Sequence, residues 1–232
     1  MNISMKRVGA IFIKDYKEFS RNYAVSIMLL FPILFAFLYR GAGEPQGEIY
    51  AFILNFSLAM MTSFIQACLI AEEKERNTLR SLMMTPASMF DVLLGKSALV
   101  FTMSAAVLAL STYIYGYEPT NLPALLFAVA ASIVLYVAVG TICGLYSRTV
   151  MEATLSVFPV LIIFTAGPYA QLFADKFPVL EVARYLPSSQ LMELLGGASG
   201  AGAVEPLVVI TLWAAALTAI SFILYKKRLK DQ

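Results

Sequence analysis

The sequence contains no histidine, and only 14% of its 232 residues are charged. The absence of histidine excludes Ser-His catalysis, histidine zinc ligands and histidine-based proton relays. The two cysteines, Cys68 and Cys143, lie in apolar stretches far apart, and we interpret them as buried apolar residues rather than a disulfide or metal pair. The net charge of +2 is too small to indicate nucleic-acid binding.

Apolar residues are in excess and make up 59% of the chain. Soluble domains contain about 45–50% apolar and about 25% charged residues, so the composition predicts an integral membrane protein. A bilayer core needs roughly 20 apolar residues per helix. The predicted fold class is all-α integral membrane, a single domain over residues 1–232 with six transmembrane helices. The six predicted spans are about 23–39, 49–71, 97–117, 123–146, 153–173 and 206–225.

Basic residues determine the predicted orientation of these spans. Lys and Arg gather in the segments that share a side with the two ends of the chain, and the other side holds only Arg40, Lys176 and Arg184. Cytoplasmic loops of membrane proteins carry an excess of Lys and Arg. Both the N-terminus and the C-terminus are therefore predicted to lie inside.

The longest predicted outer segment covers about residues 174–205. It is too apolar for a solvated loop, and the prolines at 178 and 187 divide it. We expect short helices that dip into the outer leaflet as a re-entrant segment between the fifth and sixth spans.

The N-terminal segment is predicted to form an amphipathic helix at the inner membrane surface. One mixed face is marked by residues at helical spacing: Val8, Ile11, Phe12, Asp15 and Phe19. Basic residues favour contact with the anionic lipids of the inner leaflet. The charged residues assigned to this interfacial helix are Lys14, Asp15, Lys17, Glu18 and Arg21, of which all but Asp15 are expected to face solvent.

No predicted span carries Asp, Glu, Lys or Arg in its interior. An ionisable group inside the bilayer would indicate a functional site, so this absence argues against proton-coupled carriers and intramembrane proteases. Asn55, Thr62 and Gln66 of the second span are candidates for lining a translocation path, or they hydrogen-bond to neighbouring helices. Gly140 and Gly144 form a G-x-x-x-G pattern that predicts close helix packing, within or between subunits.

The predicted inner loop between the second and third spans carries the strongest pattern. It begins with charged residues that extend the second helix, and Pro86 interrupts it. Ser88 and Asp91 have the spacing of a capping box, which predicts the start of a short helix that Gly95 ends. Lys96 would then lie at the membrane interface. Two interpretations remain open: an ordinary interfacial loop, or a docking surface for a cytosolic partner.

Three motifs of this loop, taken in order, resemble those of the ABC-2 type permeases, the membrane subunits of ATP-binding-cassette exporters. The motifs are Glu73-x-Glu75-x-Asn77-Thr78-Leu79, Thr85-Pro86-Ala87-Ser88 and Leu94-Gly95-Lys96. The family typically reads E-x-E-x-G-T-L, then T-P-V-S, then G-K, so Asn77 replaces the usual glycine. The resemblance extends to the amphipathic N-terminal helix. It also extends to Phe177-Pro178 and Leu186-Pro187, which fall where the family has its outer re-entrant segment.

The resemblance implies an assembly of several subunits. Two permeases, identical or paralogous, would pair in the cytoplasmic (inner) membrane of a prokaryote, and two ABC-type ATPase subunits would dock on their inner faces. ATP and Mg²⁺ would bind to the ATPase subunits, with no cofactor, metal or catalytic residue in this chain. The coupling loop would comprise Glu72, Glu73, Glu75, Asn77, Thr78, Leu79, Thr85, Pro86, Ser88, Asp91, Gly95 and Lys96.

Gly95-Lys96-Ser97 matches the end of the phosphate-binding motif G-x-x-x-x-G-K-[ST], but Phe90 stands where its first glycine belongs. A phosphate cradle also needs a strand-to-helix turn, and an apolar span follows here instead. We interpret the match as chance, which leaves ATP to another chain.

The functional hypothesis is a permease that exports an amphipathic or hydrophobic substrate, such as a peptide, a drug or a lipid-like molecule. Three alternatives remain open. They are sodium export by a permease of the same family, a channel or gradient-driven carrier without an ATPase, and a non-transporting membrane immunity or scaffold protein.

Overall fold

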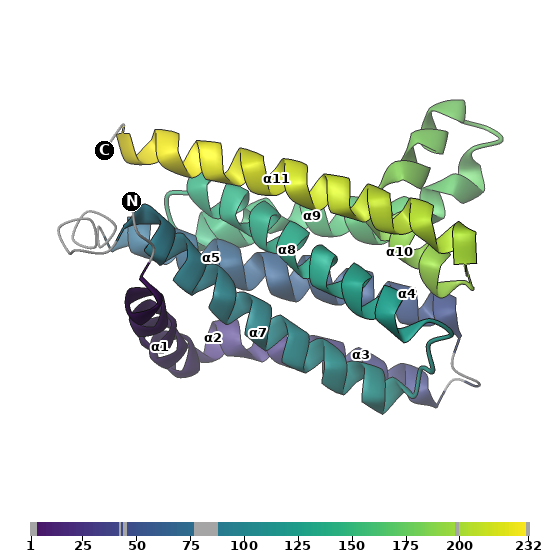
Figure 1. Cartoon of the computed structure of the whole chain (residues 1–232), viewed down its shortest axis with the longest axis horizontal. Coiled ribbons are helices and arrows are strands. Elements are labelled where there is room, and N and C mark those ends of the chain that lie inside the picture. The colour runs from purple at the N-terminus through teal and green to yellow at the C-terminus, as the bar shows by residue number, and fades with distance from the viewer. Residues whose placement is uncertain (1–3, 42, 44–45, 77–87, 198–199, 231–232) are drawn as a thin grey trace.

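The computed structural model describes residues 4–41, 43, 46–76, 88–197 and 200–230, and the regular structure within them is all helical. Figure 1 shows the long helices side by side in an elongated bundle, with both termini at one end. We call this end the termini end. The helical segments are α1 (Met5–Arg21), α2 (Tyr23–Ser26), η1 (Ile27–Leu29), α3 (Leu30–Arg40), α4 (Gly47–Ser57), η2 (Leu58–Thr62), α5 (Ser63–Glu75), α7 (Met89–Tyr115), α8 (Leu122–Tyr146), α9 (Val150–Ala170), η3 (Gln171–Phe173), η4 (Pro178–Tyr185), α10 (Pro187–Leu195), η5 (Gly200–Ala203) and α11 (Val204–Lys230).

Five helical stretches among the described residues are long and apolar enough to cross a membrane, which makes the fold compatible with a multi-pass membrane protein. The second to sixth predicted spans fall on these stretches, so their helical structure is confirmed. The stretches are Gly47–Glu75, Phe90–Tyr115, Leu122–Tyr146, Val150–Phe173 and Val204–Lys227.

The first predicted span, 23–39, is helical but divided into α2, η1 and α3. Its apolar helix, Ile27–Arg40, is shorter than the other five. Pro32 accounts for the tighter turn at η1, because it has no N–H to donate to the carbonyl of Met28 and its ring crowds that carbonyl. The segment still runs beside α7 toward the end opposite the termini (Figure 1).

The continuous helix from Gly47 to Glu75 forms the centre of the bundle and is the most completely enclosed of the five. Its polar residues are enclosed as well: the hydroxyl of Ser63 donates to the backbone carbonyl of Tyr136 on α8 at 3.1 Å. A π-helical turn over Leu58–Thr62 interrupts the regular α-helix. The Ser63 hydroxyl is therefore satisfied by a neighbouring helix, whereas the buried side-chain oxygens of Asn55 and Gln66 accept no hydrogen bond from the described residues.

Gly140 and Gly144 allow α8 to approach this central helix closely. A Cβ atom at Gly140 would lie 2.5 Å from the backbone oxygen of Ser63, and one at Gly144 would lie 2.7 Å from that of Ala67. No side chain fits at such distances. The predicted G-x-x-x-G packing is thus confirmed, and it lies within one chain.

The ends of the long helices follow local signals in the sequence. Ser88 and Asp91 form the predicted capping box at the start of α7. The side chains of Asn121 and Thr149 accept backbone N–H groups at the starts of α8 and α9. α7 ends at Gly116, whose φ of 81° is a left-handed conformation that glycine adopts without steric cost.

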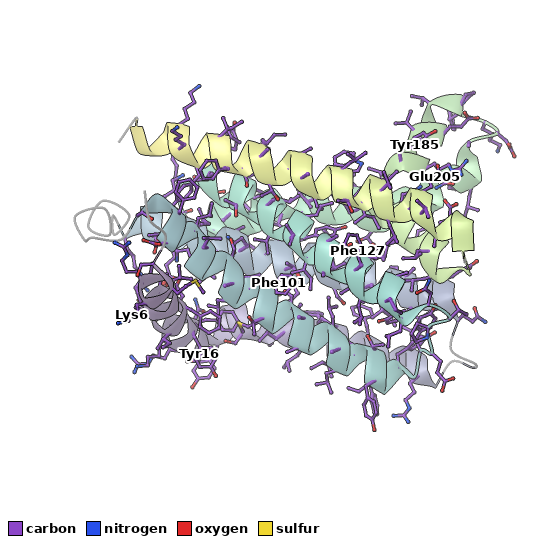
Figure 2. All side chains as sticks on the ribbon, viewed as in Figure 1. Lys6, Tyr16, Phe101, Phe127, Tyr185 and Glu205 are labelled. Carbon is purple, nitrogen blue, oxygen red and sulfur yellow. The ribbon has the colours of Figure 1, made fainter. Side chains whose placement is uncertain are left out.

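At the end opposite the termini, η3, η4 and α10 follow α9 as short helical pieces that project beside α11 (Figure 1). Pro178 and Pro187 each begin one of these pieces, which confirms the predicted short helices. Val179 and Val182 of η4 are exposed, whereas α10 is largely buried. In Figure 2, Tyr185 lies at this end. Its backbone oxygen accepts a hydrogen bond of 2.9 Å from the indole N–H of Trp213 on α11. Entry of this segment into the outer leaflet stays a prediction.

Candidate functional site

α1 packs across the start of α7 at the termini end (Figure 1). Three of the five residues predicted for one face, Ile11, Asp15 and Phe19, are buried. The other two, Val8 and Phe12, are half-buried. Gly95 of α7 meets this face, and a Cβ atom there would lie 2.8 Å from Cγ2 of Ile11 and 3.1 Å from the backbone oxygen of Val8. The glycine therefore permits the close approach of α1 to α7.

The prediction that Gly95 ends a short helix is wrong. α7 begins at Met89, directly after the capping residue Ser88, and continues without interruption to Tyr115. Glycine costs a helix about 1 kcal/mol relative to alanine, but it is tolerated where another helix packs against it. The end of the predicted coupling loop and the third predicted span thus form one continuous helix.

A buried ion cluster joins α1, α5 and α7. Nζ of Lys96 lies 3.0 Å from Oδ2 of Asp15 and 3.0 Å from Oε1 of Glu73. The side chains of Lys96, Asp15 and Glu73 are 2%, 0% and 4% exposed. Nζ of Lys14, on a side chain that is 40% exposed, lies 3.5 Å from Oδ1 of Asp15 and 3.7 Å from Oε1 of Glu73. Two ammonium groups and two carboxylates therefore balance one another, and we call these four residues the ion cluster.

The position of the ion cluster differs from the expectations for its lysines. Lys96, expected at the membrane interface, is enclosed by protein, and Lys14 turns partly away from solvent toward the two carboxylates. Partial burial opposes the charged form of Lys14, but Asp15, Glu73 and Glu18 together raise the pKa of its ammonium group above the ordinary value. Lys14 therefore stays protonated at neutral pH, and an unpaired buried carboxylate is avoided.

A second polar contact between α1 and α7 surrounds Asp91, which is fully buried. One oxygen of Asp91 accepts a hydrogen bond from the backbone N–H of Ser88 at 2.9 Å, within the capping box. The other accepts from the backbone N–H of Ser4 at 3.0 Å. Nε of Arg7 lies 3.0 Å from the carboxylate. One side chain thus fixes the first turn of α7 against the first turn of α1.

Three consecutive residues at the end of α5 attach that helix to four others. Glu73 belongs to the ion cluster, which joins α1 and α7. Lys74 donates hydrogen bonds to two backbone carbonyls at the end of α8. Glu75 accepts a hydrogen bond of 2.8 Å from the backbone N–H of Val150, at the start of α9. These attachments lie immediately before residues 77–87, the centre of the predicted coupling loop.

The remaining predicted residues of this region are placed as follows. Glu72 forms an ion pair of 2.7 Å with Arg76 one turn later. Lys17 and Arg21 are exposed on α1, as predicted, and Glu18 is half-buried and forms an ion pair within α1. Five predicted coupling-loop residues lie outside the described residues: Asn77, Thr78, Leu79, Thr85 and Pro86.

The three candidates for a translocation path lie where helices meet inside the bundle. Asn55 donates a hydrogen bond of 2.9 Å to the backbone oxygen of Ser188 on α10. The hydroxyl of Thr62 lies 2.9 Å from that of Ser104 on α7. Gln66 donates to a threonine hydroxyl on α8 at 2.9 Å. These contacts match the interhelical hydrogen bonding left open as the alternative. A path-lining role for the three residues stays a prediction.

The contacts of Glu73, Lys74 and Glu75 at the termini end all involve charged groups. Hydrogen bonds in which at least one partner is charged are stronger than neutral ones, and contacts of this kind connect α5 to its neighbours at three consecutive positions. Among the residues that the structure describes, no group of three or more His, Cys, Asp or Glu is placed to hold a metal. A movement of the chain between α5 and α7 would act on several helices at once.

In the sequence, the members of the ion cluster belong to separate features: the N-terminal helix, the charged extension of the second span and the edge of the third span. One signal was present: Asp15 lies on the apolar face of α1, between Ile11 and Phe19. A carboxylate on a face that packs against other helices needs a cationic partner. Lys96, the basic residue at the edge of an apolar span, is that cationic partner.

Comparison with known proteins does not assign the chain to a family. No family model matches it, and no curated protein matches it.

Proposed function

We propose that this chain is the membrane-spanning permease subunit of an ATP-driven exporter. It would cross the cytoplasmic membrane of a prokaryote six times, with both termini inside. ATP and Mg²⁺ would bind to separate ATPase subunits, and a second permease, identical or paralogous, would complete the path. The cargo would be an amphipathic or hydrophobic molecule, in keeping with the apolar character of the spans.

The observation that carries the proposal is the attachment of Glu73, Lys74 and Glu75 to α1, α7, α8 and α9. Glu73 and Glu75 belong to the first of the motifs that resemble the ABC-2 permeases, and all three residues lie just before residues 77–87 of the predicted coupling loop. A permease without a nucleotide site must receive the work of ATP hydrolysis through a contact surface. A loop that follows such a junction would pass a partner's movement to most of the bundle.

The arrangement of the chain ends supports the proposed orientation. Both termini and the two ends of the predicted coupling loop lie at the termini end (Figure 1). Most Lys and Arg residues belong to segments at this end, as the positive-inside rule requires of a cytoplasmic face. The short helices η4 and α10 at the opposite end would then form the outer re-entrant segment.

Co-purification tests the proposal. The chain would be extracted from its native membrane in a mild uncharged detergent, and the proteins bound to it would be identified and assayed for ATP hydrolysis. An ATPase subunit in about equal amount would support the proposal. Purification of the chain alone under several mild conditions would contradict it and favour a carrier or a scaffold.

A further inference from the structure

A cavity of about 660 Å³ lies between α4, α7 and α8, toward the end opposite the termini. This volume falls in the range of roughly 300–1,000 Å³ that is typical of small-molecule sites. Its walls are mostly apolar, with Tyr50, Tyr113 and Tyr117 near the outer end of α7. Phe101, labelled midway along α7 in Figure 2, lines both this cavity and a second one of about 800 Å³ between α7, α8 and α11.

The tyrosines at the cavity are held in place by the protein. The ring of Tyr50 stacks with that of Tyr117, with centroids 4.4 Å apart, and with that of Tyr115, at 5.8 Å. The hydroxyl of Tyr117 donates to the backbone oxygen of Leu195 at 3.1 Å, and that of Tyr115 donates to the backbone oxygen of Gln46 at 3.2 Å. Tyr50 and Tyr117 line the cavity, and Tyr115 supports the Tyr50 ring from outside it. Because the hydroxyl of Tyr117 is engaged, its ring is the part left to contact a ligand, and the ring need not reorganise to do so.

The described lining of the cavity carries negative charge only. Glu118, next to Tyr117, is the one charged group among the described residues that line it, and it forms no ion pair with any described residue. A carboxylate beside aromatic rings attracts a cation, because the face of each ring also carries negative potential. The second cavity has no charged residue among its described lining, so the same argument does not apply there.

We propose that the cavity at Tyr117 and Glu118 binds a lipophilic organic cation. The cationic group would lie at the Tyr117 ring and the Glu118 carboxylate, and the apolar body would extend along α7 and α8 toward Phe101. The proposal concerns binding at equilibrium by this chain alone. Since its test uses no ATP and no partner, its failure and the failure of the proposed transport can be told apart.

Two ions of the same shape and opposite charge test the proposal. Radiolabelled tetraphenylphosphonium and tetraphenylborate would be dialysed separately against the purified chain in dodecyl maltoside, an uncharged detergent. Saturable binding of the phosphonium at one site per chain is expected, with binding of the borate at least tenfold weaker. Equal binding of both ions, or no saturable binding of the phosphonium, would overturn the proposal.

Substitutions locate the site. Glu118→Gln should weaken phosphonium binding about fivefold, and Tyr117→Leu about five- to thirtyfold. Tyr117→Phe, which keeps the ring, should bind within about twofold of the original chain. Glu181→Gln, at an exposed position on η4 outside the cavity, is the matched control for charge and should bind normally. Glu118 is exposed, so its variant decides the matter even if Tyr117→Leu fails to fold. Unchanged affinity in Glu118→Gln would overturn the proposal.

Discussion

Nζ of Lys96 lies 3.0 Å from Oδ2 of Asp15, a contact between residues 81 positions apart that ties α1 to α7. Both side chains are enclosed, and Glu73 completes the contact from α5. The N-terminal helix is therefore held by charged groups inside the protein as well as by its apolar face. Such a contact positions α1 beside both ends of the predicted coupling loop.

Lys96→Met should destabilise the chain strongly. The substitution leaves the buried carboxylates of Asp15 and Glu73 without their enclosed cation, at a cost of about 3–5 kcal/mol. Thermal unfolding of the purified chain in detergent would measure it as a lower Tm. Lys14→Met is the matched control and should cost about 1 kcal/mol or less, since Lys14 is partly exposed. An equal fall in Tm in the two variants would contradict the role of Lys96 as the enclosed cation of the ion cluster.

A triple substitution tests whether the cost in Lys96→Met comes from unpaired charge. Asp15→Asn with Glu73→Gln removes both carboxylates from the Lys96→Met background. Breaking a buried ion cluster is costly because it leaves uncompensated charge, so a large part of the lost stability should return when both carboxylates are neutralised. A triple variant as unstable as Lys96→Met would mean that shape, not charge, decides the effect.

Gly95→Ala should separate α1 from α7. The added Cβ atom would lie 2.8 Å from Ile11 and 3.1 Å from a backbone oxygen, which forces a shift costing about 1–3 kcal/mol. Gly9→Ala, on the facing helix, is the control, because a Cβ atom there meets nothing within 4 Å. It should raise stability by about 0.5–1 kcal/mol through helix propensity. A stabilised Gly95→Ala variant would contradict the close packing of these helices.

The extent of the long helices could be predicted from the sequence, because apolar length and local caps determine it. The predicted span 123–146 coincides almost fully with Leu122–Tyr146, and the capping box of Ser88 and Asp91 is present. Pro178 and Pro187 begin short helices, since proline fits the first turn of a helix. These features depend on residues that are neighbours along the chain.

The ion cluster and the role of Gly95 could not be predicted in the same way. A glycine next to a lysine at the edge of an apolar segment indicates a helix end, and here it lies inside α7. A glycine is needed at this position because Ile11, on another helix, packs directly against it. Lys96 is likewise explained by Asp15 and Glu73, which belong to two other helices. A local pattern can show that a residue needs a partner, as Asp15 does on the apolar face of α1, but it does not identify the helices that supply the partners.

Glu75→Ala should weaken coupling without preventing assembly. It removes the acceptor for the backbone N–H of Val150, and with it the hydrogen bond between the end of α5 and the start of α9. We expect an ATPase partner to remain bound while ATP hydrolysis that depends on the permease falls several-fold. Glu181→Ala, at an exposed position on η4 at the opposite end of the bundle, is the control and should leave that activity unchanged. Loss of activity in both variants, or in neither, would contradict the junction at the end of α5.

Single cysteines test the proposed orientation. The native Cys68 is buried and Cys143 is half-buried, so both should react slowly with a membrane-impermeant maleimide. Lys176→Cys, exposed at the end opposite the termini, should be labelled in intact cells. Arg76→Cys, exposed at the termini end, should be labelled only after the membrane is opened. The reverse pattern would place the termini outside.

Replacement of the predicted coupling loop tests directly whether this loop docks an ATPase subunit. Residues 78–86 would be exchanged for a Gly-Ser linker of equal length, and the exposed turn 175–177 would receive the same treatment as a control. Each chain would be purified from its native membrane, and the bound ATPase and its ATP hydrolysis would be measured. If the loop docks the ATPase, the loop variant should fold but lose the ATPase, while the control should retain it. Docking by the loop would be contradicted if the ATPase stayed bound to the loop variant and active. The proposed exporter would be contradicted if no ATPase bound to the original chain.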